Sequence, residues 1–288
     1  MITTDFLHQL DRFSLIINKR ITSNYVGERF SHSTGRGLIF KDHTIYAPGE
    51  DFRSIDWRVY GRTDKLYVKR YEEERNLVVH VILDFSASMG FGTNMTKAEY
   101  ASMIGAGFAY LALKNNERFV LSTFSDSLEF FKPRKGRAQM ASMVEFLNDK
   151  KPKGLSKLEQ SLGGYKKLIN SKSYVVIVSD FLYPIEDIKR ALFLFKNHKV
   201  VLIQVLDKIE KNLDLEGDFK LKDLETNEVL RTYINPFARK QYSGMLQEHV
   251  DKIQEVCNEA GAQFYSANTG QNVFDVFYDV LGRHREQR

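Results

Sequence analysis

The chain has 288 residues, of which 43% are apolar and 27% are charged, and this balance excludes general disorder. Its formal net charge of +5 is small for this length, so charge alone does not indicate a nucleic-acid-binding protein. The length suffices for one large domain with an added segment. The single cysteine, Cys257, excludes an internal disulfide and a zinc site built from cysteines.

Neither a targeting signal nor a membrane span is expected. Asp5 and Asp11 interrupt the N-terminal region before an apolar run can form, which excludes a secretory signal peptide. The longest run without a charge or strong breaker lies near residues 101–113 and is shorter than the ~20 apolar residues that a bilayer requires. The lone cysteine fits a reducing compartment, and we therefore expect a cytoplasmic protein.

The N-terminal part, residues 1–76, differs in character from the rest. Apolar residues at helical spacing predict an amphipathic helix over residues 5–20. These residues are Phe6, Leu10, Phe13 and Ile17. Residues 21–75 are rich in glycine, arginine, aspartate and aromatics, which predicts irregular structure ending in a strand near 65–71. We expect residues 1–76 to pack on a main domain.

Three residues of this part carry more specific expectations. Arg53 and Asp56 lie three positions apart, a spacing that allows an ion pair on a short helix, so an internal ion pair is favoured over a binding role. The lone tryptophan, Trp57, is expected to anchor a core rather than to form a ligand platform.

From residue 77 onward, short apolar runs alternate with helical patterns. Strands are predicted at 78–83, 119–124, 128–131, 174–179, 200–205 and 263–266, and helices at 97–114, 137–148, 156–170, 185–197, around 246–257 and at 272–281. This order predicts an α/β domain over 77–288, Rossmann-like, with a mostly parallel sheet and helices on both faces. Residues 207–232 interrupt the alternation and are predicted to form an inserted hairpin around the turn at 225–228.

Polar side chains follow two of the predicted strands. Asp84, Ser86 and Ser88 occupy alternate positions after the first regular strand, so their side chains can converge on one point. Asp180 ends another strand and faces the same point if the two strands are neighbours. Carboxylates and hydroxyls are hard oxygen ligands, which suit Mg²⁺, Mn²⁺ or Ca²⁺ rather than Zn²⁺. The simpler interpretation is that Asp84 caps a helix and the hydroxyls bond the turn.

The pattern Asp84-x-Ser86-x-Ser88 resembles the metal-ion-dependent adhesion site of von Willebrand factor A domains. The resemblance implies two further ligands: a hydroxyl on a second loop, here Ser156 where that family usually has Thr, and a third-loop aspartate, here Asp180. In those adhesion sites the remaining ligand is a carboxylate from a partner protein, so the resemblance implies metal-dependent protein binding.

The preceding segment narrows the resemblance. Residues 46–57 read Tyr-Ala-Pro-Gly-Glu-Asp-Phe-Arg-Ser-Ile-Asp-Trp and resemble a segment of the bacterial "domain of unknown function 58" family. Glu50 replaces the usual Asp, and Thr44 stands where an Arg is expected. The resemblance covers roughly residues 25–200. It implies an adaptor, not an enzyme, that works with a MoxR-type AAA+ ATPase in a bacterial chaperone-like system.

Catalytic alternatives find little support in the residues. A divalent-metal phosphatase with Asp84 as nucleophile stays open, but Ser86 stands where that chemistry needs a second acid. Neither Ser86 nor Ser88 lies in a Gly-x-Ser-x-Gly motif, and the sequence contains no phosphate-binding P-loop.

The positive charge concentrates in residues 132–172, which hold eleven basic and three acidic residues. A nucleic-acid-binding role for this segment stays open as an alternative, although we consider nucleic acid unlikely as a partner. Because the segment includes Ser156, it predicts a basic rim that steers an acidic protein partner to the site. A solvated helix face explains the same charges equally well.

Overall fold

The computed structural model describes residues 2–25, 34–72, 78–115, 117–131, 138–169 and 172–282. The chain forms two compact units. One unit comprises Met1–Ser14 together with Leu77–Arg288, and the other comprises Leu15–Asn76. None of the described helices is long and apolar enough to cross a lipid bilayer.

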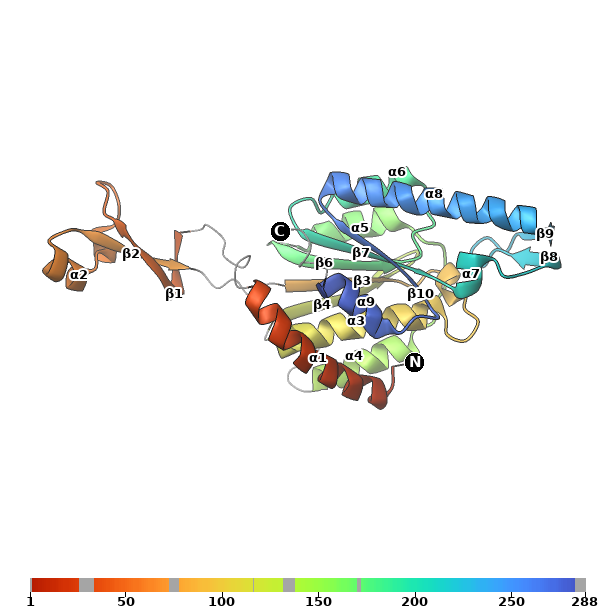
Figure 1. Ribbon diagram of the computed structural model, residues 1–288, viewed down its shortest axis with the longest axis horizontal. Coiled ribbons are helices and arrows are strands. Elements are labelled where there is room, and N and C mark those ends of the chain that lie inside the picture. Colours follow the sequence, from red (N-terminus) through yellow and green to blue (C-terminus); the bar gives the residue numbers. More distant parts are fainter. Residues whose placement is uncertain are drawn as a thin grey trace. The chain divides into compact units, whose positions relative to one another are not determined.

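A six-stranded sheet forms the centre of the larger unit (Figure 1). Its strands, in spatial order, are β10 (Gln263–Asn268), β7 (Lys199–Leu206), β6 (Ser173–Ser179), β3 (Val78–Asp84), β4 (Arg118–Phe124) and β5 (Leu128–Phe130). All neighbours are parallel except β5, which pairs antiparallel to β4. The chain reverses its direction of strand addition between β3 and β6, which is where open α/β sheets bind ligands.

Helices cover both faces of this sheet (Figure 1). On one face lie α3 (Lys97–Lys114), α4 (Ala138–Asp149), α9 (Val273–Gly282) and the first turns of α1 (Thr4–Tyr25). On the other face lie α5 (Leu158–Lys166), α6 (Ile185–Phe193) and α8 (Pro236–Ala260). The predicted α/β fold of von Willebrand A type is therefore confirmed, because its strands and helices appear in the expected order.

The core on the second face consists of apolar side chains that the sequence periodicity predicts. Ile82 and Val175 of the sheet pack with Leu192 of α6 and with Ile253 and Cys257 of α8. All five side chains are at most 2% exposed. Burial of this kind supplies most of the free energy that opposes unfolding.

The first turns of α1 attach to the opposite layer through aromatic rings. Phe6, Leu10 and Phe13 are buried, as the helical spacing predicts. The ring of Phe13 lies 5.3 Å from Phe274 and 5.7 Å from Phe277, both on α9. The predicted contribution of Ile17 falls on a side chain outside the described residues.

The smaller unit pairs β1 (Thr34–Ile45) antiparallel with β2 (Tyr67–Glu72) and carries α2 (Trp57–Thr63). Asp56 caps α2 by accepting a hydrogen bond from the Arg58 N–H, and its Oδ2 lies 2.9 Å from His43 Nε2 and 3.3 Å from Lys69 Nζ. The bond with His43 is the main cause that lowers the pKa of Asp56 to about 2. The predicted pairing of Arg53 with Asp56 is wrong, because residues distant in sequence take that carboxylate.

The expectation for Trp57 is also wrong. This side chain is 61% exposed, and its ring meets that of Tyr60 edge to face at 6.0 Å. Within its unit, α2 contributes no buried residue. A two-stranded sheet with one short helix offers too little surface to enclose an indole ring.

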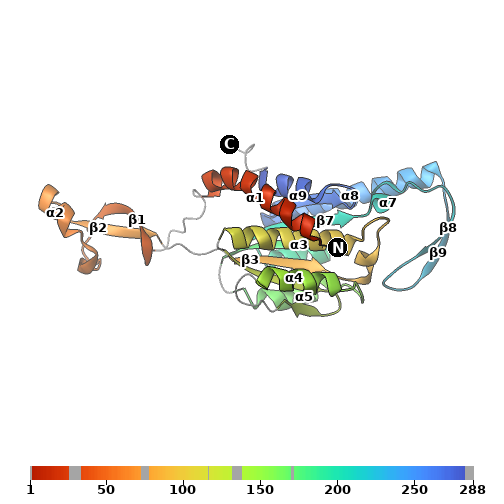
Figure 2. The same cartoon turned by 90° about the horizontal axis from the view of Figure 1, so that it is seen from below.

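An antiparallel hairpin lies in the predicted interruption of the α/β pattern. It pairs β8 (Gly217–Lys222) with β9 (Val229–Ile234), and Leu221 stands opposite Leu230. A short helix that the sequence analysis did not predict, α7 (Lys208–Asn212), precedes the hairpin. Figure 2 shows the hairpin beyond the end of the sheet at which β3 terminates.

Glycine in α3 permits close packing between layers. A Cβ atom built on Gly107 would lie 2.1 Å from the ring of Phe277, whose side chain is fully buried. We predict that Gly107→Ala lowers the free energy of unfolding by about 1–3 kcal/mol, because overpacking outweighs the better helix propensity of alanine. Chemical denaturation measures this change.

Gly244→Ala in α8 is the matched control, since Gly244 is exposed and a Cβ atom there would meet nothing within 4 Å. It should raise the free energy of unfolding by about 0.5–1 kcal/mol. Equal effects of the two substitutions would contradict the packing of α3 against α9.

Candidate metal-binding site

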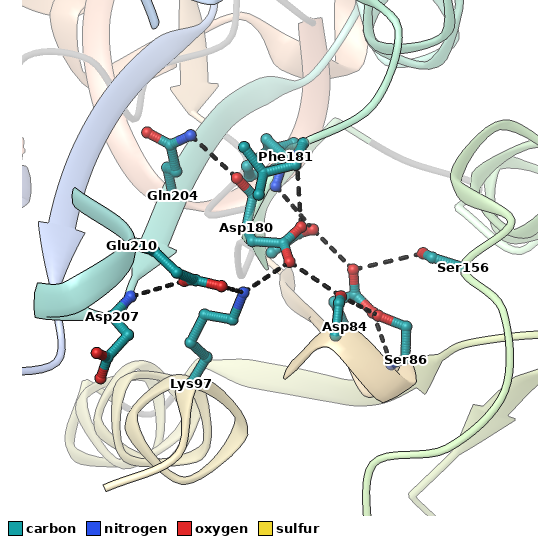
Figure 3. A network of polar contacts seen from close by, with 12 residues as sticks. Asp84, Ser86, Lys97, Ser156, Asp180, Phe181, Gln204, Asp207 and Glu210 are labelled. Carbon is teal, nitrogen blue, oxygen red and sulfur yellow. Dashed lines mark hydrogen bonds and ion pairs between the residues drawn. The ribbon is translucent and has the colours of Figure 1, made fainter. Parts of the chain in front are cut away.

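The polar residues predicted from the sequence meet where β3 and β6 end side by side (Figure 3). Asp84 is the last residue of β3, and Asp180 directly follows β6. Ser86 and Ser88 lie on the loop after β3, which winds into one 3₁₀ turn over Ala87–Gly90. The two strands are therefore neighbours, as the convergence of Asp84 and Asp180 requires.

The carboxylate of Asp84 is fully buried and accepts hydrogen bonds at both oxygens. Its Oδ1 accepts from the backbone N–H of Ser86 at 2.8 Å, the kind of turn bond that the simpler interpretation predicts. Its Oδ2 accepts from Ser179 Oγ at 2.7 Å and from Tyr183 OH at 2.5 Å. Helix capping alone does not account for the contacts of Oδ2, because these donors lie on β6 and on the loop that follows it.

Hydroxyl groups link the two aspartates. Ser86 Oγ lies 3.1 Å from Ser88 Oγ, and Ser88 Oγ donates to Asp180 Oδ2 at 2.9 Å. Ser156 Oγ donates to Asp84 Oδ2 at 3.4 Å. These contacts bring all five predicted residues into one continuous polar cluster. Figure 3 labels four of them, Asp84, Ser86, Ser156 and Asp180.

Backbone hydrogen bonds hold the loop that carries Ser156 against the loop after β3. The N–H of Lys153 donates to the Phe85 carbonyl at 2.9 Å, and the N–H of Ala87 donates to the Gly154 carbonyl at 3.0 Å. Gly154 has a φ of +79°, a left-handed conformation that favours glycine. These bonds position Ser156 between Asp84 and Tyr183, whose hydroxyl it also contacts.

A buried lysine that was not predicted from the sequence completes the cluster. Lys97 is the first residue of α3, and its side chain is 1% exposed. Its Nζ donates to Asp180 Oδ2 at 3.0 Å and to Glu210 Oε1 at 2.8 Å. The other Glu210 oxygen, Oε2, accepts from the backbone N–H of Asp207, so α7 is tied to the cluster.

Burial perturbs the ionisation of these groups. Burial, and then the charge of Asp180, raises the pKa of Asp84 to about 6. Burial also raises the pKa of Glu210, and the two carboxylates keep the pKa of Lys97 above its usual value although burial opposes this. Fully ionised, three carboxylates and one ammonium group leave two uncompensated negative charges in a buried cluster.

The donor set fits a hard divalent cation. Most of the polar atoms in the cluster are carboxylate and hydroxyl oxygens, which are the ligands that Mg²⁺, Mn²⁺ and Ca²⁺ prefer. Among the described residues, no group of three or more His, Cys, Asp or Glu side chains is arranged to hold a metal. The oxygen donors next to the two aspartates are serine hydroxyls, which are neutral ligands.

The sequence matches a described protein family. Residues 42–252 match the family described as "Protein of unknown function DUF58". The chain belongs to this family. The DUF58 chain is 25% identical over 282 residues to the uncharacterized protein Rv1480 of Mycobacterium tuberculosis, an alignment that covers 96% of this chain and 89% of that protein. The family expected from the sequence is confirmed.

Two solved structures show more distant similarity. BatB from Bacteroides thetaiotaomicron is 14% identical with a TM-score of 0.44, covering 72% of this chain and 99% of that one. The von Willebrand A domain of SpRpn10 is 14% identical with a TM-score of 0.43, covering 71% and 95%. The strand order and helix layers described above, and not these distant likenesses, establish the fold of the DUF58 chain.

The raised pKa of Asp84 predicts how stability depends on pH. Because the folded pKa of about 6 exceeds that of the unfolded chain, unfolding releases protons and the metal-free protein loses stability as pH rises from about 4 to 7. In the presence of chelator, Asp84→Asn should therefore gain stability relative to the natural protein by about 1–3 kcal/mol over this range. Denaturation at several pH values measures this difference.

Asp207→Asn provides a control of opposite sign. Asp207 is also buried at the end of a strand, but hydrogen bonds from Ile209, Thr269 and Thr93 outweigh burial and lower its pKa. This variant should lose stability relative to the natural protein as pH rises through the acidic range. If the difference in the free energy of unfolding between Asp84→Asn and the natural protein did not change with pH, the raised pKa of Asp84 would be contradicted.

Proposed function

We propose that this DUF58 protein is a metal-dependent protein-interaction module. Its ion, Mg²⁺ or alternatively Mn²⁺ or Ca²⁺, is held by oxygen atoms of Asp84, Ser86, Ser88, Ser156 and Asp180. The observation that carries the proposal is the buried cluster of oxygen atoms around Asp84, which in its fully ionised form has a net charge of the size that one divalent ion neutralises. Since Lys97 already donates to Asp180 Oδ2, this aspartate contributes through its other oxygen or through water.

A bound ion would supply an electrophilic position for one more oxygen ligand. Only two carboxylates face it, and the hydroxyls are neutral, so the ion keeps part of its charge. A carboxylate from a partner protein is the ligand that best completes such a shell. Protein binding would then depend on both the ion and the acidic residue.

The loop that carries Ser156 supports an acidic partner. Lys151, Lys153 and Lys157 are exposed on it, while Lys150 pairs with Glu129 at 2.6 Å. Exposed positive charge beside a carboxylate-binding position accelerates association with an acidic surface. Another part of the basic segment, residues 132–137, lies outside the described residues.

The family resemblance adds the class of partner. We propose a MoxR-type AAA+ ATPase, with this chain as adaptor in a bacterial chaperone-like system in the cytoplasm. We propose no catalytic role, because a phosphatase nucleophile must reach its substrate. Asp84 is fully buried, and both of its oxygens accept hydrogen bonds.

Metal binding should stabilise the fold. At a Mn²⁺ or Mg²⁺ concentration of about 100 times Kd, ligand binding contributes about 2.7 kcal/mol, which raises Tm by roughly 5–10 °C. Asp84→Asn should abolish this rise because it removes one of two charged ligands. Differential scanning calorimetry with and without metal measures the shift.

Asp207→Asn should keep the full rise, since the Asp207 carboxylate is occupied by Thr93, Thr269 and the start of α7. An equal rise in Tm on metal addition in Asp84→Asn and the natural protein would show that the ion binds elsewhere.

Binding of a purified MoxR-type ATPase should weaken when a chelator is added and also when Asp84 is replaced by Asn. Equal binding in all these conditions would show that the metal takes no part in the interaction.

A further inference from the structure

The hairpin β8–β9 brings a fourth acidic side chain to the site, beside the three carboxylates of Asp84, Asp180 and Glu210. Glu225 lies in its turn, and Glu225 Oε2 accepts a hydrogen bond from the backbone N–H of Ser156 at 3.4 Å. From Lys220 to Arg231 every residue is exposed except Glu225, which is half-buried. Figure 2 shows the hairpin at the end of the sheet where β3 terminates. The chain thus places one of its own carboxylates beside a residue of the proposed ligand set.

The turn does not depend on the side chain of Glu225 for its shape. Asp223 Oδ1 accepts from the N–H of Glu225 at 2.7 Å and from the N–H of Thr226 at 3.2 Å. The N–H of Asp223 donates to the Glu228 carbonyl at 2.9 Å, which closes the turn. The Glu225 carboxylate is therefore available for contacts outside the hairpin.

Without a cation, the position of the Glu225 carboxylate is electrostatically unfavourable. Asp84 and Asp180 already leave negative charge uncompensated, and a further carboxylate at the same edge adds repulsion. The basic residues of the Ser156 loop relieve part of it, but a divalent ion between Ser156 and Asp84 would turn the repulsion into attraction. Glu225 contacts the backbone of Ser156, a residue of the proposed ligand set, so its carboxylate lies where such an ion could attract it.

Resting on the proposed function, we infer that Glu225 is an internal, displaceable ligand of the metal ion. Its carboxylate occupies the coordination position that the partner's acidic side chain takes on binding. Displacement is feasible because the contact is long for a hydrogen bond and the hairpin is a two-stranded ribbon outside the main sheet. The hairpin then sets the minimum affinity for a partner, because only an acidic side chain that displaces Glu225 from the ion can bind.

Water relaxation by bound Mn²⁺ tests this inference in the full chain. With Glu225→Gln, a water molecule should replace the lost carboxylate, so the proton relaxation rate per bound Mn²⁺ rises. The affinity for Mn²⁺ should fall on the order of tenfold. Added acetate should lower the relaxation rate of Glu225→Gln back toward that of the natural protein. Glu228→Gln, which alters an exposed carboxylate of the same turn, should match the natural protein throughout.

The possible failures are distinguishable. Normal Mn²⁺ binding with the same relaxation rate in Glu225→Gln, Glu228→Gln and the natural protein would overturn this inference and leave the proposed metal site intact. Absence of Mn²⁺ binding in the natural protein would overturn the proposed function and this inference together.

Discussion

The polar cluster at the carboxyl edge of the sheet depends on two carboxylates that adjacent strands bring together. Asp84 is the last residue of β3 and Asp180 directly follows the adjacent parallel strand β6, so strand pairing brings both carboxylates to the same edge of the sheet. Ser88 bonds directly to Asp180, and Ser179 bonds directly to Asp84. Most other features of the site follow from the need to compensate this buried negative charge.

Compensation from within the chain is incomplete. Lys97 supplies one buried positive charge, but it also recruits Glu210, so the cluster as a whole remains negative. The shared ammonium group links the carboxyl end of β6 to α7, which begins the insertion that carries the hairpin. One side chain therefore connects the aspartate cluster with the start of the insertion.

Much of this arrangement is predictable from the sequence, because it depends on local periodicity. The apolar run ending at Asp84 and the alternation of Asp84, Ser86 and Ser88 indicate both the strand and the convergence of side chains. Ser156 needed the family resemblance, since nothing in its local sequence shows that the loop folds back against Phe85. The bonds from Lys153 and Ala87 that hold it there become visible only in the structure.

The environments of the residues that were not predicted, or were predicted wrongly, depend on tertiary contacts rather than on local sequence. Lys97 opens a helix rich in small and apolar residues, a weak signal that its side chain is buried, whereas Glu210 lies in an insertion without any pattern. Trp57 was expected in a core because it is large and apolar, but exposure depends on whether a second layer exists to cover it. Asp56 likewise pairs with His43 and Lys69, partners that sequence spacing cannot identify.

We propose above all that a divalent ion neutralises the buried negative charge of Asp84 and Asp180. Anomalous X-ray scattering from crystals of the full chain grown with Mn²⁺ tests it most directly. The account predicts one strong anomalous peak bonded to oxygen atoms of Asp84, Ser86 and Ser88. Mn²⁺ peaks confined to other surfaces, with the hydrogen bonds of Asp84 and Ser88 unchanged, would contradict it.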